Sequence, residues 1–365
     1  MPAACIRVGC HPRVRAVSLC NFLSGNGKPA SSIWKPETRN KNASFHCYCA
    51  TAVLNTSIPL KILTPLGKLI AVGGNEDKGT YPNPRTRRKY YLNFFELGIL
   101  KRVVLESGKA DPRIEVITTA SMIPAEVGPI YTASFAMLNC LKVGIMDIRT
   151  PEDARQPEYL ERLLAADVIM FSGGNQSRLR EMFGETDFLD RLTQRYFAEP
   201  NFVIAGTSAG AVAMSQRMIR GGSVPDALLK GAVKMGAGLG FLPAAIIDSH
   251  FVKRGRFGRL IESVALNPRL IGIGLGEDTG VLITEGNWVE TIGSNLVIIL
   301  DGHDIQHNNA AAAKKGTVLS IENITMHVLA KGNVYDMRER KFYASKDALA
   351  TRATTPVTEP GAGTL

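Results

Sequence analysis

Short apolar runs rich in Val and Ile alternate with longer amphipathic stretches from Lys68 onward. The runs have the length and composition of buried strands. The expected strands are 68–72, 114–119, 143–146, 168–171, 202–205, 244–247 and 271–275. The expected helices are 94–107, 125–141, 151–165, one beginning near 176, and 209–217. This alternation is typical of βαβ units, so we expect an α/β fold with a mostly parallel, doubly wound sheet covered on both faces.

The pattern changes toward the C-terminus. The runs Val281–Ile283, Asn287–Val289 and Leu296–Leu300 are short and closely spaced, with Glu285-Gly286-Asn287 between the first two. This spacing predicts antiparallel hairpin strands joined by a turn. We therefore expect one domain over residues 61–345. The remaining tail, 346–365, is rich in Thr, Ala and Pro and is predicted to be disordered.

Residues 1–60 differ from the rest of the chain. They show no steady periodicity, and their seven basic residues and one acidic residue account for +6 of the net charge of +10. Poor in acid and dotted with Arg, the segment is predicted to be a disordered or targeting-like extension, or a translated upstream region. The remaining body is nearly balanced in charge, so no nucleic-acid partner is expected.

The positions of the cysteines and the lengths of the apolar runs exclude further classes of protein. Five of the six Cys lie in residues 1–60 and only Cys140 lies beyond, so a disulfide framework for the body is excluded. The pair Cys47 and Cys49 is too close and isolated for a zinc site of ordinary spacing. No run of 18 apolar residues occurs, so no membrane span is expected.

The motif Gly206-Thr207-Ser208-Ala209-Gly210 follows the apolar run 202–205 and opens a predicted helix. Small residues two before and two after Ser208 allow a strained turn that projects the hydroxyl, as in a nucleophile elbow. The same motif would also suit a tight turn with a Ser N-cap. The sequence thus makes Ser208 a candidate nucleophile.

A Ser hydroxyl needs a base, and the His residues after Ser208 are His250, His303, His307 and His327. His250 follows the strand at 244–247 through Asp248-Ser249, at a strand end where ligand sites of parallel sheets form. Glu277 follows the strand at 271–275 in the same way and could orient the base. The other His residues lie elsewhere: a loop at 301–309 could hold a metal with Asp301, His303, Asp304 and His307, although a solvated loop suits it better.

Two glycine-rich junctions could supply backbone N–H groups. Phe171-Ser172-Gly173-Gly174-Asn175-Gln176 joins a strand to a helix, and its glycines allow close approach to a ligand. We expect an oxyanion hole from the N–H groups of Gly174 and Ala209. Gly73-Gly74-Asn75 repeats the design after the first strand, where a turn with a helix cap is equally expected.

Together these motifs resemble the serine peptidase family of cyanophycinase and aspartyl dipeptidase (peptidase E). The resemblance covers residues 66–340. It rests on the motifs at 172–176 and 206–211, on Asp248-Ser249-His250-Phe251 with its following arginines, and on 272–279. Spacing agrees as well, with 42 residues from Ser208 to His250 and 27 more to Glu277.

The resemblance implies a fold similar to class I glutamine amidotransferases, of the flavodoxin-like type, and a triad of Ser208, His250 and Glu277. It implies hydrolysis of cyanophycin, a poly-aspartate with arginine on each side chain, or of a β-aspartyl peptide. It further implies a cytoplasmic homodimer with no cofactor and no metal. The substrate-binding residues that it implies are Asn175, Gln176, Asp248, Ser249, Arg254, Arg256 and Arg259.

Two positions depart from the family pattern. Cyanophycinases usually carry Asp where this chain has Asn175, and Gln where it has Ser249 before the base. Arg256 and Arg259 share a helical face at a spacing of three, whereas Arg254 does not. We therefore expect at least one of these arginines to be a structural ion-pair partner.

Three other functions stay open on the sequence. The chain could be an aspartyl dipeptidase acting on short N-terminal Asp peptides. It could be an α/β-hydrolase esterase that uses His303, His307 or His327, although the arginines after His250 would then be unexplained. It could also be a catalytically silent ligand-binding relative, against which the intact Ser, His and Glu argue.

Overall fold

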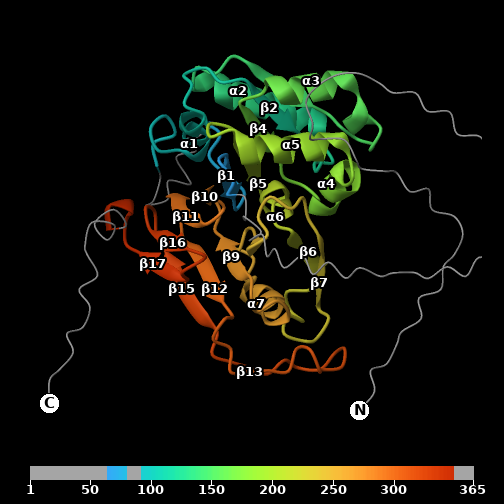
Figure 1. The fold of residues 1–365 in the computed structure, drawn as a ribbon, viewed down its shortest axis with the longest axis vertical. Coiled ribbons are helices and arrows are strands. Elements are labelled where there is room, and N and C mark those ends of the chain that lie inside the picture. The colour runs from blue at the N-terminus through green and yellow to red at the C-terminus, as the bar shows by residue number, and fades with distance from the viewer. Residues whose placement is uncertain (1–63, 80–91, 349–365) are drawn as a thin grey trace, which may run out of the picture. The chain divides into compact units, whose positions relative to one another are not determined.

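The structure, a computed structural model, describes residues 64–79 and 92–348 (Figure 1). The extension predicted at 1–60 and residues 349–365 of the predicted tail lie outside the described residues. Residues 346–348 are helical, so regular structure reaches the beginning of that tail. Across the described ranges, no helix has the length and apolar character needed to cross a membrane.

Five parallel strands form the centre of the main sheet. They are β1 (Lys68–Val72), β2 (Ile114–Ile117), β3 (Val143–Met146), β4 (Val168–Phe171) and β5 (Val203–Thr207). Their spatial order is β1-β5-β4-β2-β3. The strands β1, β2, β4 and β5 are almost completely buried, as parallel strands covered on both faces require, whereas the edge strand β3 is mostly half-buried. The sequence located all five of them to within two residues.

Antiparallel strands continue this sheet beyond β1. They are β10 (Thr279–Thr284), β11 (Trp288–Gly293), β16 (Val334–Asp336) and β17 (Lys341–Tyr343). Within the described residues the sheet has nine strands, ordered β17-β16-β11-β10-β1-β5-β4-β2-β3 (Figure 1). The predicted α/β class, with a parallel centre and an antiparallel hairpin after residue 279, is confirmed.

Helices cover both faces of the parallel strands. They are α1 (Ile99–Glu106), α2 (Pro124–Met137), α3 (Pro157–Ala165), α4 (Gln176–Phe183), α5 (Asp187–Ala198) and α6 (Ala209–Ala213). Alternate residues of β1 serve two cores: Ile70 packs with residues of α1 and α2, whereas Leu69 packs with residues of α3 to α6. This alternation is the period of a strand, and it makes the sheet doubly wound.

The helix expected over 151–165 is interrupted. A single 3-10 turn, η2 (Asp153–Arg155), precedes α3, and Gln156 between them has an extended backbone with ψ of 133°. Pro157 causes the break, because a proline ring disfavours the helical conformation in the residue before it while suiting the first position of a helix.

A second sheet carries two of the strands that the sequence grouped with the first. It is ordered β15-β12-β9-β8 and contains β8 (Ala245–Asp248), β9 (Ile271–Leu275), β12 (Val297–Asp301) and β15 (Thr325–Leu329). Helix α7 (Phe257–Leu266) crosses from β8 to β9, which pair in parallel. The expectation that 244–247 and 271–275 extend the main sheet was therefore wrong, because an apolar run records burial and not which strand lies beside it.

Some short elements escaped the pattern altogether. They are the hairpin of β6 (Arg217–Gly222) and β7 (Val233–Ala237) and the small pair β13 (His307–Asn308) and β14 (Ile321–Glu322). The helix expected to run to 217 ends at Ala213, and β6 begins four residues later. Glycines and exposed charges interrupt the alternation in β6 and β7, so neither a helical nor a strand period is visible there.

Candidate active site

Ser208 lies at a strained turn between β5 and α6. Its backbone has φ of 50° and ψ of −106°, and its N–H donates to the carbonyl of Val72 over 2.8 Å. The flanking glycines make the turn possible: a Cβ at Gly206 would lie 2.7 Å from Gly210 C, and one at Gly210 would lie 2.5 Å from Phe171 O. A strained turn with close-packed glycines is the geometry of a nucleophile elbow.

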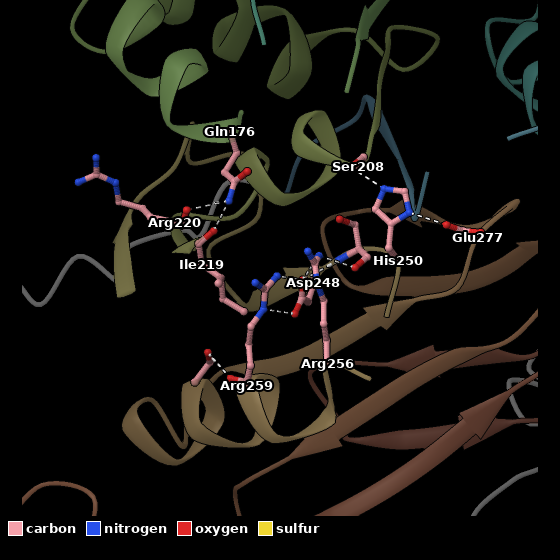
Figure 2. A network of polar contacts seen from close by, with 11 residues as sticks. Gln176, Ser208, Ile219, Arg220, Asp248, His250, Arg256, Arg259 and Glu277 are labelled. Carbon is pink, nitrogen blue, oxygen red and sulfur yellow. Dashed lines mark hydrogen bonds and ion pairs between the residues drawn. The ribbon is translucent and has the colours of Figure 1, made fainter. Parts of the chain in front are cut away.

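His250 faces the Ser208 hydroxyl from the end of β8. Its Nε2 atom lies 3.0 Å from Ser208 Oγ, and its Nδ1 atom lies 2.8 Å from Oε1 of Glu277 (Figure 2). A carboxylate only accepts hydrogen bonds, so Nδ1 carries the proton and Nε2 is free to accept from the hydroxyl. The imidazole also packs on Gly74, where a Cβ would lie 2.4 Å from Cε1.

Glu277 is held from three directions. Besides His250, Oε1 accepts from Nδ2 of Asn75 over 2.7 Å, and Oε2 pairs with Nζ of Lys253 over 2.9 Å. Burial disfavours its charge, but the contacts with Lys253, His250 and Asn75 outweigh burial and hold the pKa of Glu277 below its ordinary value. The acid is therefore ionised next to the imidazole.

The pKa of His250 is lowered. Burial is the main cause and the nearby charges of Arg254 and Arg256 add to it, against the hydrogen bond to Glu277, which raises the pKa. A lowered pKa keeps the imidazole neutral at pH 7, which is the form that can take a proton from Ser208.

Backbone N–H groups of two neighbouring strand ends lie unused near the nucleophile. Gly173 lies close to Ser208: a Cβ added at Gly173 would be 3.6 Å from the Cβ of Ser208. Asn175 donates its own N–H to the carbonyl of Ala120. Within the described ranges, the N–H groups of Gly174 and Ala209 donate to no other protein group.

Asp248 forms a buried ion-pair cluster on the side of His250 away from Ser208. Figure 2 shows Arg256 and Arg259 converging on it, with Arg259 Nε at 2.8 Å and Arg256 Nη1 at 3.1 Å from its carboxylate oxygens. Asp248 is 0% exposed and Arg259 is 5% exposed. The N–H of Ser249 completes the cluster.

This cluster corrects part of the expected substrate cleft. Asp248 and Arg259 are buried and paired with each other, an arrangement that disfavours direct contact of either with a substrate. Arg259 forms a buried ion pair with Asp248, as expected for at least one of the three arginines. Arg254 is exposed, and the described part of the chain gives it no ion pair.

Two more of the expected binding residues hold local structure. Asn175 is exposed and caps α4 by accepting from the N–H of Ser177. Gln176 donates from Nε2 to the carbonyls of Ile219, at 2.7 Å, and Arg220, at 3.2 Å, which ties α4 to β6 (Figure 2). Within the described ranges no group donates to the amide oxygen of Gln176.

The alternative bases lie elsewhere. His303 is exposed and pairs with Asp304, and His307 lies in β13. His327 lies in β15, with its ring 5.3 Å from the ring of Tyr335 at a tilt of 48°. Asp301 is engaged by Arg340 and Tyr335. Searched over 64–79 and 92–348, the chain has no group of three or more His, Cys, Asp or Glu that could hold a metal ion.

Known proteins are similar to this chain in sequence and in fold. The profile described as Peptidase family S51 matches residues 97–291, which include Ser208, His250 and Glu277. The chain belongs to peptidase family S51. It is 33% identical over 242 residues to the cyanophycinase of Trichormus variabilis, covering 66% of this chain and 81% of that protein. Over 272 residues it is 33% identical to the cyanophycinase of Synechococcus elongatus, covering 74% and 80%.

The fold agrees with this assignment. A peptidase from an acI-B1 actinobacterium superimposes with a TM-score of 0.51 at 20% identity, covering 75% of this chain and 98% of that one. Family membership makes the chain an S51 serine peptidase, so the interpretations as an α/β-hydrolase esterase and as a silent relative are set aside.

Some residues of this S51 peptidase site were not found from the sequence. Lys253 lies three residues after His250 in a turn, where nothing marks it as a partner of Glu277. Asn75 was noted only as part of a Gly-Gly-Asn turn. Its distance in sequence from Glu277 hides the contact, and only the antiparallel pairing of β1 with β10 brings them together.

Glu76 is the third residue that the sequence did not reveal. It is 4% exposed, and its carboxylate accepts from the hydroxyls of Tyr131 and Thr207, each over 2.5 Å. Burial would raise the pKa of Glu76, but the Lys78 charge, 3.0 Å away, and the two hydroxyls lower it overall. Because Thr207 directly precedes Ser208, this buried carboxylate holds the side chain next to the nucleophile in place.

Proposed function

We propose that this S51 peptidase hydrolyses the backbone peptide bonds between the aspartates of cyanophycin through Ser208, His250 and Glu277, releasing β-Asp-Arg dipeptides. One observation carries the proposal: the continuous chain of hydrogen bonds from Ser208 Oγ through both nitrogens of His250 to Glu277, at 3.0 and 2.8 Å. Nucleophile, base and orienting acid are thereby aligned before substrate binds.

In the proposed reaction, Ser208 Oγ attacks the scissile carbonyl and its proton passes to Nε2 of His250. Glu277 keeps the imidazole in the correct tautomer and stabilises the imidazolium. His250 then gives the proton to the leaving amine, and an ester to Ser208 forms as the peptide bond breaks. Water, deprotonated by His250, hydrolyses that ester and restores the hydroxyl.

The tetrahedral intermediate carries a negative oxygen that needs donors. We assign the N–H groups of Gly174 and Ala209 to this role. They follow β4 and β5, which are adjacent parallel strands, and both are free of other acceptors within the described residues. The start of α6 adds its partial positive charge at the same point.

The substrate class is inferred from charge. Arg254 is exposed close to His250 and can pair with a carboxylate of the β-Asp-Arg unit in a bidentate manner. Arg256, half-buried, has an Nε–H group without a partner among the described residues. Asn175 and the free amide oxygen of Gln176 lie at the start of α4, beside the proposed oxyanion donors, and complete the proposed binding set.

Ser249 suggests looser selectivity than in the usual cyanophycinase. It stands directly before the base, is 3% exposed, and lacks the amide that the family usually has there. A lost pocket hydrogen bond costs about 1–3 kcal/mol if its partner stays buried. We therefore expect Lys-containing or shorter β-Asp substrates to be cut as well.

A comparison of kcat/KM values tests the substrate. Cyanophycin, β-Asp-Lys material and α-Asp dipeptides are offered to the purified protein, and products are identified by mass spectrometry. The proposal expects β-Asp-Arg release with the highest kcat/KM on cyanophycin and a measurable rate on β-Asp-Lys material. A clear preference for α-Asp dipeptides would instead identify an aspartyl dipeptidase.

The proposal includes a homodimer in the cytoplasm, as the resemblance to cyanophycinase implies. Sedimentation velocity of the purified protein tests the first part and would show a species of twice the chain mass of 39.5 kDa. Fractionation of cells followed by immunodetection tests the second.

A further inference from the structure

The loop after β1 contacts each segment that carries a residue of the proposed triad. The carbonyl of Val72 accepts from the N–H of Ser208 over 2.8 Å, and the carbonyl of Gly73 accepts from the N–H of His250 over 2.8 Å. The carbonyl of Gly74 accepts from the N–H of Asp278, next to Glu277, over 2.9 Å. Three consecutive residues, the last of β1 and the first two of the loop after it, thus fix the backbone at the nucleophile, at the base and beside the acid.

Asn75 continues this series with its side chain. Its Nδ2 donates over 2.7 Å to Oε1 of Glu277, the same oxygen that lies 2.8 Å from Nδ1 of His250. The residue is exposed, and its φ of 51° is a left-handed conformation that Asn adopts more readily than most residues. Among the described residues the Asn75 amide bonds to Glu277 alone, so this hydrogen bond is what has to be explained.

We propose that Asn75 is a positioning residue that locks the Glu277 carboxylate in the rotation that serves His250, an inference that rests on the proposed function. Lys253 also binds this carboxylate, but its side chain is 58% exposed, and an ammonium on a long stem sets no direction. The amide of Asn75 is directional and stands on a loop already bonded to both neighbours. It is also neutral, so it orients the acid without cancelling its charge.

Charged groups on every side set the titration of His250. Glu277 faces it after β9, while Arg254, Arg256 and, through Glu277, Lys253 face it from the segment after β8. The Glu76 carboxylate is engaged by Thr207 and Tyr131, and the Asp77 carboxylate accepts from the N–H of Gly79. An acid in place of Asn75 would therefore add a charge beside Glu277, with only Lys253 close enough to offset it.

The test measures the pH dependence of covalent labelling of the full-length protein by a fluorophosphonate, which needs no knowledge of the natural substrate. Asn75→Asp keeps shape and tolerates the left-handed backbone, but replaces a donor with a charge. Asn75→Gly removes the amide and relaxes the backbone. The matched control is Asn139→Asp, because Asn139 has φ of 63° and lies before β3 at the amino ends of the strands, the edge opposite the site.

Asn75→Asp is expected to move the acidic limb of the labelling rate to higher pH by about 0.5–1 unit, because added negative charge raises the pKa of His250. Asn75→Gly is expected to lower the maximal labelling rate about tenfold, with the half-saturating probe concentration unchanged. Asn139→Asp should change neither. If Asn75→Gly instead raises the half-saturating probe concentration and leaves the maximal rate unchanged, Asn75 binds the ligand and the positioning role is overturned.

The two proposals fail in different ways. If Ser208→Ala is labelled as fast as the unchanged protein, the nucleophile is wrong and the proposed function fails. If Ser208→Ala is not labelled, while Asn75→Asp and Asn75→Gly follow the pH profile and rate of the unchanged protein, only the role of Asn75 is overturned. Circular dichroism of each variant checks that the fold is retained.

Discussion

Nε2 of His250 lies 3.0 Å from Oγ of Ser208 although the two residues leave strands of different sheets. Ser208 follows β5 in the nine-stranded sheet, and His250 follows β8 in the four-stranded sheet. Both N–H groups bond to the end of β1, at Val72 and Gly73. The site therefore forms only when the two sheets are docked, so its activity reports on the packing between them.

The proposed triad predicts the order of three variants. Ser208→Ala and His250→Ala should lower kcat by similar factors, on the order of 10^5–10^6, because nucleophile and base act as a unit, and Glu277→Gln should cost less, about 10^3–10^4. Steady-state kinetics on the best substrate measures these losses. Near-normal turnover in His250→Ala, with activity abolished in His303→Ala or His327→Ala, would show that the base is misassigned.

The pH profile follows from the lowered pKa of His250. The base must be neutral, so activity should be lost as pH falls through a pKa below the ordinary value of 6.5. Arg254→Gln removes a positive charge that lowers this pKa, so the acidic limb should move up by about 0.3 unit, and less at high salt. Fluorophosphonate labelling between pH 4.5 and about 9 measures the limb. The control is Arg155→Gln, which changes an exposed arginine on η2. An acidic limb that shifts equally in both variants would exclude a local effect of Arg254.

Glu76 should be needed for the stability of the elbow. Glu76→Gln removes the charge that holds the hydroxyls of Thr207 and Tyr131. The free energy of unfolding should therefore fall by about 1–3 kcal/mol. Since the folded-state pKa of Glu76 is lowered from 4.5, its contribution is present above pH 4.5 and is lost as pH falls through the folded value. The difference from the unchanged protein, measured by urea denaturation, should thus shrink in acid. A difference that is independent of pH would contradict an ionised Glu76.

The segment at 1–60 should be dispensable. It lacks core periodicity and holds most of the net charge, so a shortened chain that begins at Pro65 should fold and keep its activity. Differential scanning calorimetry and the labelling assay compare it with the full chain. Loss of cooperative melting and of solubility in the shortened chain would show that the segment belongs to the fold.

The three members of the proposed triad could be singled out from the sequence because each carries a local signal. Ser208 stands between glycines after an apolar run, and His250 and Glu277 each follow another run directly. Strand ends are visible in one sequence, since burial alternates with polar junctions over a few residues. The same reasoning separated Arg254 from Arg256 and Arg259, because helical spacing is also local.

Contacts across the fold could not be predicted in this way. That Asp248 would be neutralised by its own arginines, and that Asn75 and Lys253 would hold Glu277, depends on which segments lie side by side. The division into two sheets was missed for the same reason.

The sequence by itself determined the α/β class, the five central strands and the three residues of the proposed triad, because these depend on periodicity and on neighbours within a few positions. Only the tertiary structure decided which charges are buried and which face a ligand. Asp248, Arg259 and Glu76 became internal supports, while Arg254 stayed exposed beside the base. Desolvation and pairing are set by how segments pack in space, whether the partners are 11 residues apart, as Asp248 and Arg259 are, or 131, as Glu76 and Thr207 are, and a linear pattern does not contain that information.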